Sequence, residues 1–217
     1  MNVLYEDEYL LCVNKPPGVS VQRDKTGDIP LEQLVRLSFA GVVHRIDKPV
    51  SGVVLFAKTK AALTRLSEQV QKAQWRKVYW AIVGGTPPEQ KGELVHFLKK
   101  NGRVNKSFVY EKPGEGTKEA RLTYACIGSS HRYSFLRIEL ATGRHHQIRC
   151  QLAHLGCPVK GDVKYGSKRS NRDGGIGLHA RSIELDHPMS GERLKLTGEP
   201  PDDVLWRLFT EAMNDVS

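Results

Sequence analysis

The chain has 217 residues, of which 39% are hydrophobic and 26% are charged, and this composition excludes a chain that is disordered throughout. The 33 Lys and Arg residues outnumber the 24 Asp and Glu residues, so the net charge is +9. This balance suggests a polyanionic partner and leaves nucleic acid, an acidic membrane or an acidic protein open.

The excess positive charge lies in the middle of the chain. Residues 1–40 hold 4 basic and 6 acidic side chains, and residues 198–217 hold 1 basic and 5 acidic side chains. Residues 41–197 therefore carry 28 basic and 13 acidic side chains, a net charge of +15. We expect this middle part to contact the anion.

The location of the protein is indicated by its apolar runs and its cysteines. No apolar run approaches the roughly 18 residues of a membrane span, and the acidic start of the chain does not resemble an export signal. The sparse cysteines form no Cys-x-x-Cys pair: they are Cys12, Cys126, Cys150 and Cys157. We therefore expect a cytoplasmic protein with reduced thiols and no membrane partner.

The first quarter of the chain predicts short strands and two helices. Apolar runs on either side of the acidic residues 6–8 are typical of two strands joined by a tight turn. Residues 31–37 repeat Leu and Val at helical spacing, and residues 61–70 do so again. Between them, the apolar residues 52–58 are typical of a buried strand.

The rest of the chain predicts more strands than helices. Strands are expected over 75–83, 120–127 and 133–140, with an exposed insertion, either strand-poor or hairpin-bearing, over 86–118 and a basic loop over 164–177. Thr142 is the expected N-cap of a helix, and the acidic segment 198–217 should hold a final helix with an apolar face of Val204, Leu205, Leu208 and Phe209. Because strands mostly follow one another, we expect an α+β fold with a largely antiparallel mixed sheet, flanking helices and loops.

Two patterns that suggest other functions are weak. Gly175–Ala180 matches the letters of a dinucleotide-binding turn, but it follows a basic loop rather than a strand and no helical pattern comes after it. The second half of the chain is rich in histidine, yet none has a second ligand at a usual metal spacing, so we expect no metal and disfavour a metal hydrolase. These histidines are His145, His146, His154, His179 and His187.

Three segments combine charged side chains with Gly and Pro: His44–Gly52, Leu140–Arg149 and Gly156–Gly166. In the first, Asp47 follows Arg45 on a loop that leads into a strand, so an ionised carboxylate near positive charge is expected. A solvated ion pair would explain the first segment alone, and a capped helix with a basic face would explain the second.

In this order, the three segments resemble the RluA-type pseudouridine synthases. The family carries His-Arg-Leu-Asp-x-x-Thr-Ser-Gly, which matches residues 44–52 except that Ile46 replaces the leucine and Val50 replaces the threonine. It also carries Thr-Gly-Arg-x-His-Gln-Ile-Arg and Gly-x-Pro-x-x-Gly-Asp-x-x-Tyr-Gly, which match 142–149 and 156–166. Further matches are the Lys-x-Tyr-x-Ala strand at 77–81 and the closing segment at Leu178-His-Ala180 and His187-Pro188.

The resemblance implies an enzyme that isomerises a specific uridine to pseudouridine in structured RNA and needs no cofactor. It implies Asp47 as the catalytic carboxylate, acting as a nucleophile at the sugar or as a base in a glycal-type route. Arg144 is then its ionic partner, and Tyr79 stacks on the target base. The implied architecture is a single catalytic domain over residues 1–217 with a catalytic cleft, in a form without the N-terminal S4 RNA-binding domain of many relatives.

The resemblance also implies an RNA surface made of basic side chains. The candidates are His44, Arg45, Arg149, Lys164, Lys168, Arg169 and Arg172. We expect a monomer that acts on transfer RNA or large-subunit ribosomal RNA. The alternative is a non-catalytic RNA-binding module of the same fold, although Asp47, Tyr79 and Arg144, whose replacement would mark such a module, are all present.

Overall fold

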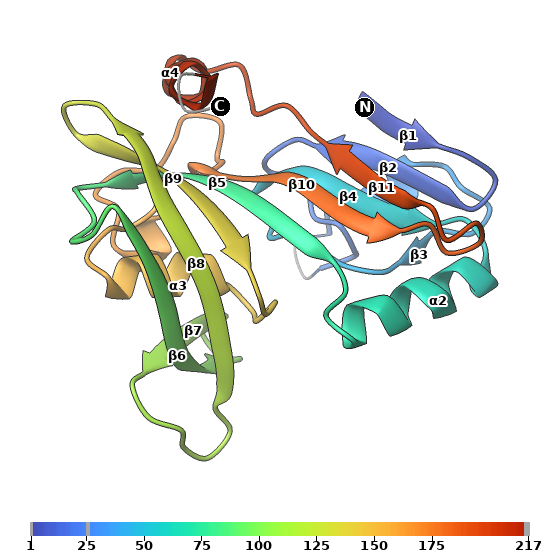
Figure 1. Cartoon of the computed structure of the whole chain (residues 1–217), viewed down its shortest axis with the longest axis horizontal. Helices are drawn as coiled ribbons and strands as arrows, with labels where there is room; N and C mark the ends of the chain where they lie inside the picture. Colours follow the sequence, from blue (N-terminus) through green and yellow to red (C-terminus); the bar gives the residue numbers. More distant parts are fainter. Residues whose placement is uncertain (1, 25–26, 215–217) are drawn as a thin grey trace. The chain divides into compact units, whose positions relative to one another are not determined.

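The structure is a computed structural model that describes residues 2–24 and 27–214 (Figure 1). The chain forms two compact units, of which the first comprises residues 1–77 and 179–201 and the second comprises residues 78–178 and 202–217. No helix in the described part of the chain combines the length and the apolar composition of a membrane-spanning helix.

The strands of the first unit pair in the order β1, β2, β4, β10. β1 (Asn2–Glu6) is antiparallel to β2 (Leu10–Lys15), which is antiparallel to β4 (Ser51–Ala57). β4 runs parallel to β10 (Leu178–Asp186), and β10 is antiparallel to β11 (Arg193–Thr197). The short β3 (Gly41–Val42) also pairs with β4 (Figure 1).

Two helices belong to the first unit. α1 (Leu31–Leu34) is a single turn, and α2 (Lys60–Gln71) packs on β3 and β4. The hydroxyl of Thr59 caps α2 by accepting the N–H of Ala62 at 3.2 Å. Every residue of β4 is buried, and α2 covers part of the apolar surface of this strand. Buried side chains of β2, β4, α2, β10 and β11 form the core cluster of the unit.

The second unit is an antiparallel sheet in the order β5, β9, β8, β6, β7. Its strands are β5 (Arg76–Gly84), β6 (Lys91–Asn101), β7 (Lys106–Tyr110), β8 (Lys118–Ser129) and β9 (Tyr133–Leu140). Its helices are α3 (Gln147–His154), the 3-10 helix η1 (Val163–Tyr165) and α4 (Val204–Asn214). α3 contacts β6 and β7, so the hairpin formed by these two strands has a helix against it.

The expected α+β class with a mixed, mostly antiparallel sheet is confirmed, and the four cysteines are free thiols. Of the two alternatives for the insertion, the hairpin-bearing one is confirmed, because β6 pairs with β7 and alone spans 11 residues. Two local predictions were wrong. The helix expected from Thr142 begins only at Gln147. On α4, Val204 and Leu208 are exposed, whereas Trp206 joins Phe209 in the core.

Candidate active site

Asp47 lies on a turn between β3 and β4 of the first unit. The N–H of Val50 donates to the carbonyl oxygen of Asp47 at 3.0 Å and closes the turn. Ile46 and Val50, on either side, are 7% and 2% exposed, whereas Asp47 itself is partly exposed. The two buried anchors therefore hold the carboxylate at the surface. Val50, which stands at the position of the family's threonine, supports the turn by apolar packing.

The end of this turn requires a glycine. Gly52 has φ +122°, and a Cβ at this position would lie 2.3 Å from the carbonyl oxygen of Ala180 in β10. Only a residue without a side chain allows the two backbones to approach this closely. Any other residue would push apart the strands that carry the Asp47 turn.

Ser51 and His179 fix the base of the same turn. Burial lowers the pKa of His179 to about 4, so its imidazole is neutral at pH 7. Its Nε2 lies 2.9 Å from the carbonyl oxygen of Gly198 and donates to it, which leaves Nδ1 to accept the Ser51 hydroxyl at 2.9 Å. This histidine, grouped by sequence with possible metal ligands, therefore supports the turn.

Lys15, at the end of β2, is a buried lysine in electrostatic contact with Asp47, and no sequence pattern singled it out. Its side chain is 1% exposed, and Nζ donates to the carbonyl oxygens of Pro16 at 2.9 Å, Val19 at 2.7 Å and Lys48 at 3.1 Å. Burial lowers the pKa of Lys15 to about 7, while the charge of Asp47 acts in the opposite direction. Three carbonyl oxygens match the three N–H groups of the ammonium form, so Lys15 ties the turn to the end of β2.

His44 and Arg45, two of the expected RNA contacts, precede Asp47. The N–H of Leu55 donates to His44 Nε2 at 3.0 Å, and the His44 ring meets Trp75 edge-on at 5.4 Å. Burial and the charge of Lys77 lower the pKa of His44 to about 3, so this ring is neutral. Arg45 is exposed and open to solvent.

Tyr79 and Arg144 belong to the second unit. On β5, Val78 and Trp80 face the core cluster with Phe209, so the partly buried Tyr79 between them faces the other side of the sheet. Arg144 is exposed between β9 and α3, where its Nε donates to the carbonyl oxygen of Glu119 at 2.8 Å.

The segment around Arg144 is fixed by one amide side chain. Gln147 Oε1 accepts the Thr142 hydroxyl at 2.8 Å and the N–H of Arg144 at 2.9 Å. Thr142 is therefore bonded to the first residue of α3 instead of capping an earlier helix. His146, in the left-handed conformation at φ 52°, is the N-cap residue of α3, and its Nδ1 forms a hydrogen bond of 3.0 Å with the hydroxyl of Tyr165.

The remaining expected RNA contacts fall into two groups. Arg149 is 5% exposed and pairs in bidentate fashion with Asp162, with N–O distances of 2.6 Å and 2.9 Å. Its guanidinium is thus committed to the interior of the second unit. The other group is exposed on and after η1 and consists of Lys164, Lys168, Arg169 and Arg172.

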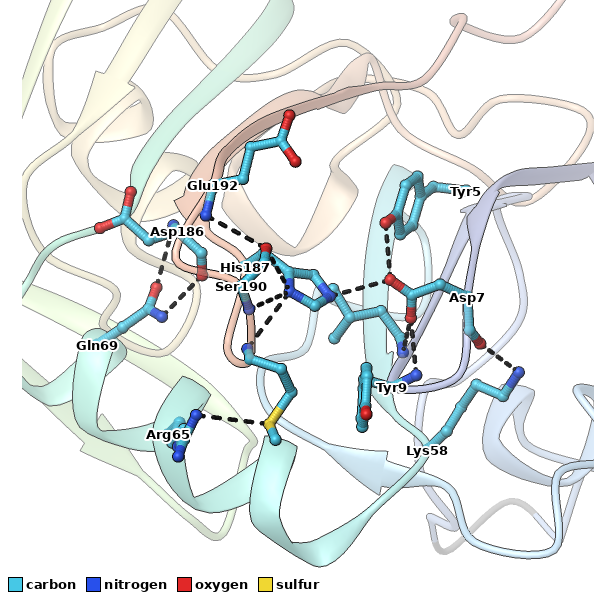
Figure 2. Close-up of polar contacts among 12 residues, drawn as sticks. Tyr5, Asp7, Tyr9, Lys58, Arg65, Gln69, Asp186, His187, Ser190 and Glu192 are labelled. Atoms are coloured by element: carbon cyan, nitrogen blue, oxygen red, sulfur yellow. Dashed lines mark hydrogen bonds and ion pairs between the residues drawn. The ribbon is translucent and has the colours of Figure 1, made fainter.

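A Ser-His-Asp arrangement is present in the first unit, where Figure 2 shows His187 between Asp7 and Ser190. His187 Nδ1 accepts the backbone N–H groups of Met189 at 3.3 Å and Ser190 at 3.0 Å, and Nε2 donates to Asp7 Oδ2 at 2.9 Å. Because backbone groups already use the Nδ1 lone pair, the imidazole cannot serve as a base for Ser190. The arrangement joins the turn between β1 and β2 to the turn between β10 and β11.

Replacing Asp7 by Asn is expected to reduce stability by about 1–2 kcal/mol at neutral pH. Burial alone would raise the pKa of Asp7, but hydrogen bonds from Tyr5, from the N–H groups of Tyr9 and Leu10, and from His187 lower it below its usual value. This stabilisation is present above about pH 4 and is lost as the pH falls through the lowered pKa. When urea unfolding is measured from pH 7 to pH 2, the free energy of unfolding should therefore fall less steeply with decreasing pH in the variant than in the wild type. Glu8→Gln, on the exposed neighbour, is the matched control and should keep the wild-type dependence on pH.

Several known proteins are similar to this chain. The family model described as RNA pseudouridylate synthase matches residues 9–154. The chain is 31% identical to ribosomal large subunit pseudouridine synthase D of Pseudomonas aeruginosa, over 96% of this chain and 71% of that protein. It is 32% identical to tRNA pseudouridine synthase C of Salmonella typhi, over 89% of this chain and 83% of that protein. Among solved structures, human RNA pseudouridylate synthase domain containing 1 is 25% identical, with a TM-score of 0.78 over 92% of this chain and 83% of that one.

Proposed function

Because the chain belongs to the RNA pseudouridylate synthase family, whose members are isomerases, we propose that it converts a specific uridine of structured RNA to pseudouridine in the cytoplasm, with Asp47 as its catalytic carboxylate. The observation that carries the assignment of Asp47 is its turn: a partly exposed carboxylate stands between two buried anchors, above a buried lysine. Such a turn presents one charged group to a substrate and fixes its position.

The proposed reaction changes the connection of the base and leaves the composition of the RNA unchanged. The bond from C1′ to N1 breaks, the uracil rotates, and a bond from C1′ to C5 forms; C5 loses a proton and N1 gains one. Asp47 contributes either by attacking C1′ and leaving again when the base returns, or by removing a proton from the sugar in a glycal-type route. Both routes need the ionised carboxylate.

Lys15 keeps Asp47 charged in this proposal. A carboxylate in a site filled by RNA would lose hydration and be pushed toward its neutral form, and a nearby cation opposes this. Lys15 is buried, and its position is fixed by three carbonyl oxygens, so its charge is screened less than that of a surface lysine.

Tyr79 and Arg144 take the roles that the resemblance implies. Tyr79 stacks on the extruded uracil, and Arg144 is the ionic partner of the catalytic carboxylate. Both are on the accessible side of their segments, since Tyr79 faces away from the core cluster and Arg144 is exposed.

The RNA is bound by exposed basic and aromatic side chains. Extruding a uridine costs a few kcal/mol, which phosphate contacts and stacking must offset. The exposed basic side chains on and after η1, together with Arg45, supply phosphate contacts. β7 adds Phe108 and Tyr110, which are 42% and 46% exposed and lie on one face of the strand with Lys106, so they can stack on unpaired bases. Arg149 is left out of this proposed surface because its guanidinium is buried in the ion pair with Asp162.

The function is tested by mapping pseudouridine in total RNA from cells with and without the gene. A position in transfer RNA or large-subunit ribosomal RNA that loses pseudouridine in the deletion, and regains it when the purified chain is added to the RNA, supports the proposal. If no position changes, and the purified chain still binds RNA, the alternative of a non-catalytic binding module is favoured.

Replacing Arg144 by Lys is expected to lower the rate of conversion by about a hundredfold or more, because a point charge cannot replace a bidentate guanidinium. The rate is measured under single-turnover conditions on the mapped RNA, and binding of the RNA is measured in parallel. Arg132→Lys, on the exposed turn between β8 and β9, is the matched control and should change the rate little. A wild-type rate in Arg144→Lys would remove this residue from the catalytic group.

A further inference from the structure

Three side chains that could bind a metal ion meet in the second unit. His96 lies on β6, Glu111 directly follows β7, and His154 is the last residue of α3. Their donor atoms all lie within 4.8 Å of one another, and no other group of three such side chains is found in residues 2–24 and 27–214. Two imidazoles and one carboxylate are donors that zinc and its neighbours in the first transition row accept.

The distances are close to those of a metal site. His154 Nε2 and Glu111 Oε1 are 2.6 Å apart, His96 Nε2 and Glu111 Oε1 are 4.0 Å apart, and the two imidazole rings are centred 5.1 Å apart, nearly perpendicular. Tetrahedral zinc bonds of about 2.0–2.1 Å place the donor atoms about 3.3 Å from one another. The carboxylate must therefore move away from one imidazole and toward the other by less than about 1 Å in each direction.

The exposure of the three side chains suits this movement. His96 is held, with its side chain 11% exposed, while the side chains of Glu111 and His154 are 68% and 44% exposed. The exposed pair can rotate onto an ion that the buried imidazole anchors, and water can fill the fourth position. The carboxylate offsets one of the two charges of the ion.

Gln151, one turn before His154 on α3, sets the protonation of the buried imidazole. Its Nε2 lies 3.0 Å from His96 Nδ1, so Nε2 of the ring is the nitrogen directed toward Glu111. A metal on that nitrogen moves the remaining ring proton to Nδ1, which then needs an acceptor. Gln151 Oε1 is buried and has no hydrogen-bond partner among the described residues, and a half-turn of the amide brings it to Nδ1.

Rotating the Gln151 side-chain amide by a half-turn costs hydrogen bonds, and this cost limits the affinity of the cluster for a metal ion. Gln151 Nε2 also donates to the carbonyl oxygens of Leu94 and Ala120, each at 3.2 Å, and the turned amide gives these hydrogen bonds up. With three protein ligands and this cost, a dissociation constant in the micromolar range is expected.

We propose that His96, Glu111 and His154 bind a divalent cation of the zinc class, which joins the hairpin of β6 and β7 to the end of α3. The ion takes no part in the isomerisation proposed above. Its effect is to hold the hairpin, whose other face carries Phe108 and Tyr110, against the helix that follows Arg144. Without an ion, the three side chains are joined by the hydrogen bond between His154 and Glu111, the longer His96–Glu111 contact and the edge contact of the two imidazoles.

The test is a calorimetric titration of the full chain, stripped with a chelator and desalted, with zinc chloride. One equivalent of zinc should bind, and His96→Gln and Glu111→Gln should each weaken binding by about tenfold or more. Glu111→Gln keeps a hydrogen-bonding oxygen beside His154, so the fold is retained. His131→Gln, on an exposed histidine outside the cluster, is the matched control and should bind like the wild type. Cobalt(II) should give the visible absorption of a tetrahedral site in the wild type and lose it in both cluster variants.

Two results would overturn the proposal. One is the absence of zinc binding tighter than about 1 mM, which leaves a surface ion pair only. The other is one-equivalent binding that the folded cluster variants retain, which places the ion elsewhere. Neither result bears on the isomerisation, because the RNA mapping described above is read separately.

Discussion

An Asp47→Asn variant is expected to bind its RNA as tightly as the wild type and to lose more than about a thousandfold in the rate of pseudouridine formation. The amide has nearly the shape of the carboxylate, so the turn closed by Val50 and the anchor of Ile46 should persist. What disappears is the negative charge that attacks the sugar or accepts its proton. The measurement is single-turnover conversion of the mapped RNA, with filter binding of the same RNA.

The control for Asp47→Asn is Glu68→Gln, which removes the same charge from an exposed carboxylate on α2 of the first unit. It should convert RNA at the wild-type rate. Conversion by Asp47→Asn within tenfold of the wild type would place the chemistry on another group. Loss of binding together with conversion would instead show that the turn itself had collapsed, and circular dichroism of the variant distinguishes these results.

The strands were predictable wherever apolar residues stood close together between turn signals. Residues 52–58 were expected to be a buried strand because the run lacks charge, and β4 is buried throughout. Acidic residues 6–8 were expected to be a turn, and Asp7 N–H does bond to the carbonyl of Leu10 across it. These signals are local, so tertiary contacts did not need to be known.

The helix predictions failed where a contact with a distant part of the chain determines where a helix begins or which of its faces is buried. Thr142 has the side chain of an N-cap, but its hydroxyl also accepts the N–H of Arg121 in β8, so no helix begins there and α3 begins only after His146. On α4, the heptad-like spacing favoured Val204 and Leu208, whereas the aromatic surface around Trp80 selects Trp206. The spacing on a short helix fixes the face only within about one residue.

The segments of the proposed site could be found from the sequence, whereas the contacts that surround them in the fold could not. The segment around Asp47 was identified by its residues, while the support from Lys15 depends on a contact with Lys48, 33 positions away. The sequence signal that could have indicated this role is the position of Lys15 at the end of a mostly apolar strand. His96 and His154 are 58 positions apart, so no short-range spacing of the kind typical of metal ligands connects them in the sequence.

A second large effect is expected at the buried ion pair between Arg149 and Asp162. Asp162→Ala should destabilise the protein by about 3–5 kcal/mol, because it leaves a guanidinium that is 5% exposed without its partner. The ring of Tyr165 at 5.2 Å gives only a weaker cation-π contact in return. The measurement is urea unfolding followed by tryptophan fluorescence. Asp202→Ala, which breaks an exposed pair with Arg207 in the same unit, should cost less than about 1 kcal/mol.

The double variant Arg149→Met with Asp162→Leu separates the charge from the packing. If the loss in Asp162→Ala comes from an unpaired buried charge, removing both charges should recover most of it, since well-packed apolar side chains can replace a buried pair. Equal losses in the single and the double variant would show that the carboxylate is needed for the turn into η1, where the N–H of Tyr165 bonds to the carbonyl of Asp162. A loss in Asp162→Ala no greater than that in Asp202→Ala would mean that water reaches the pair, and Arg149 would then be open to the phosphate contact expected from the sequence.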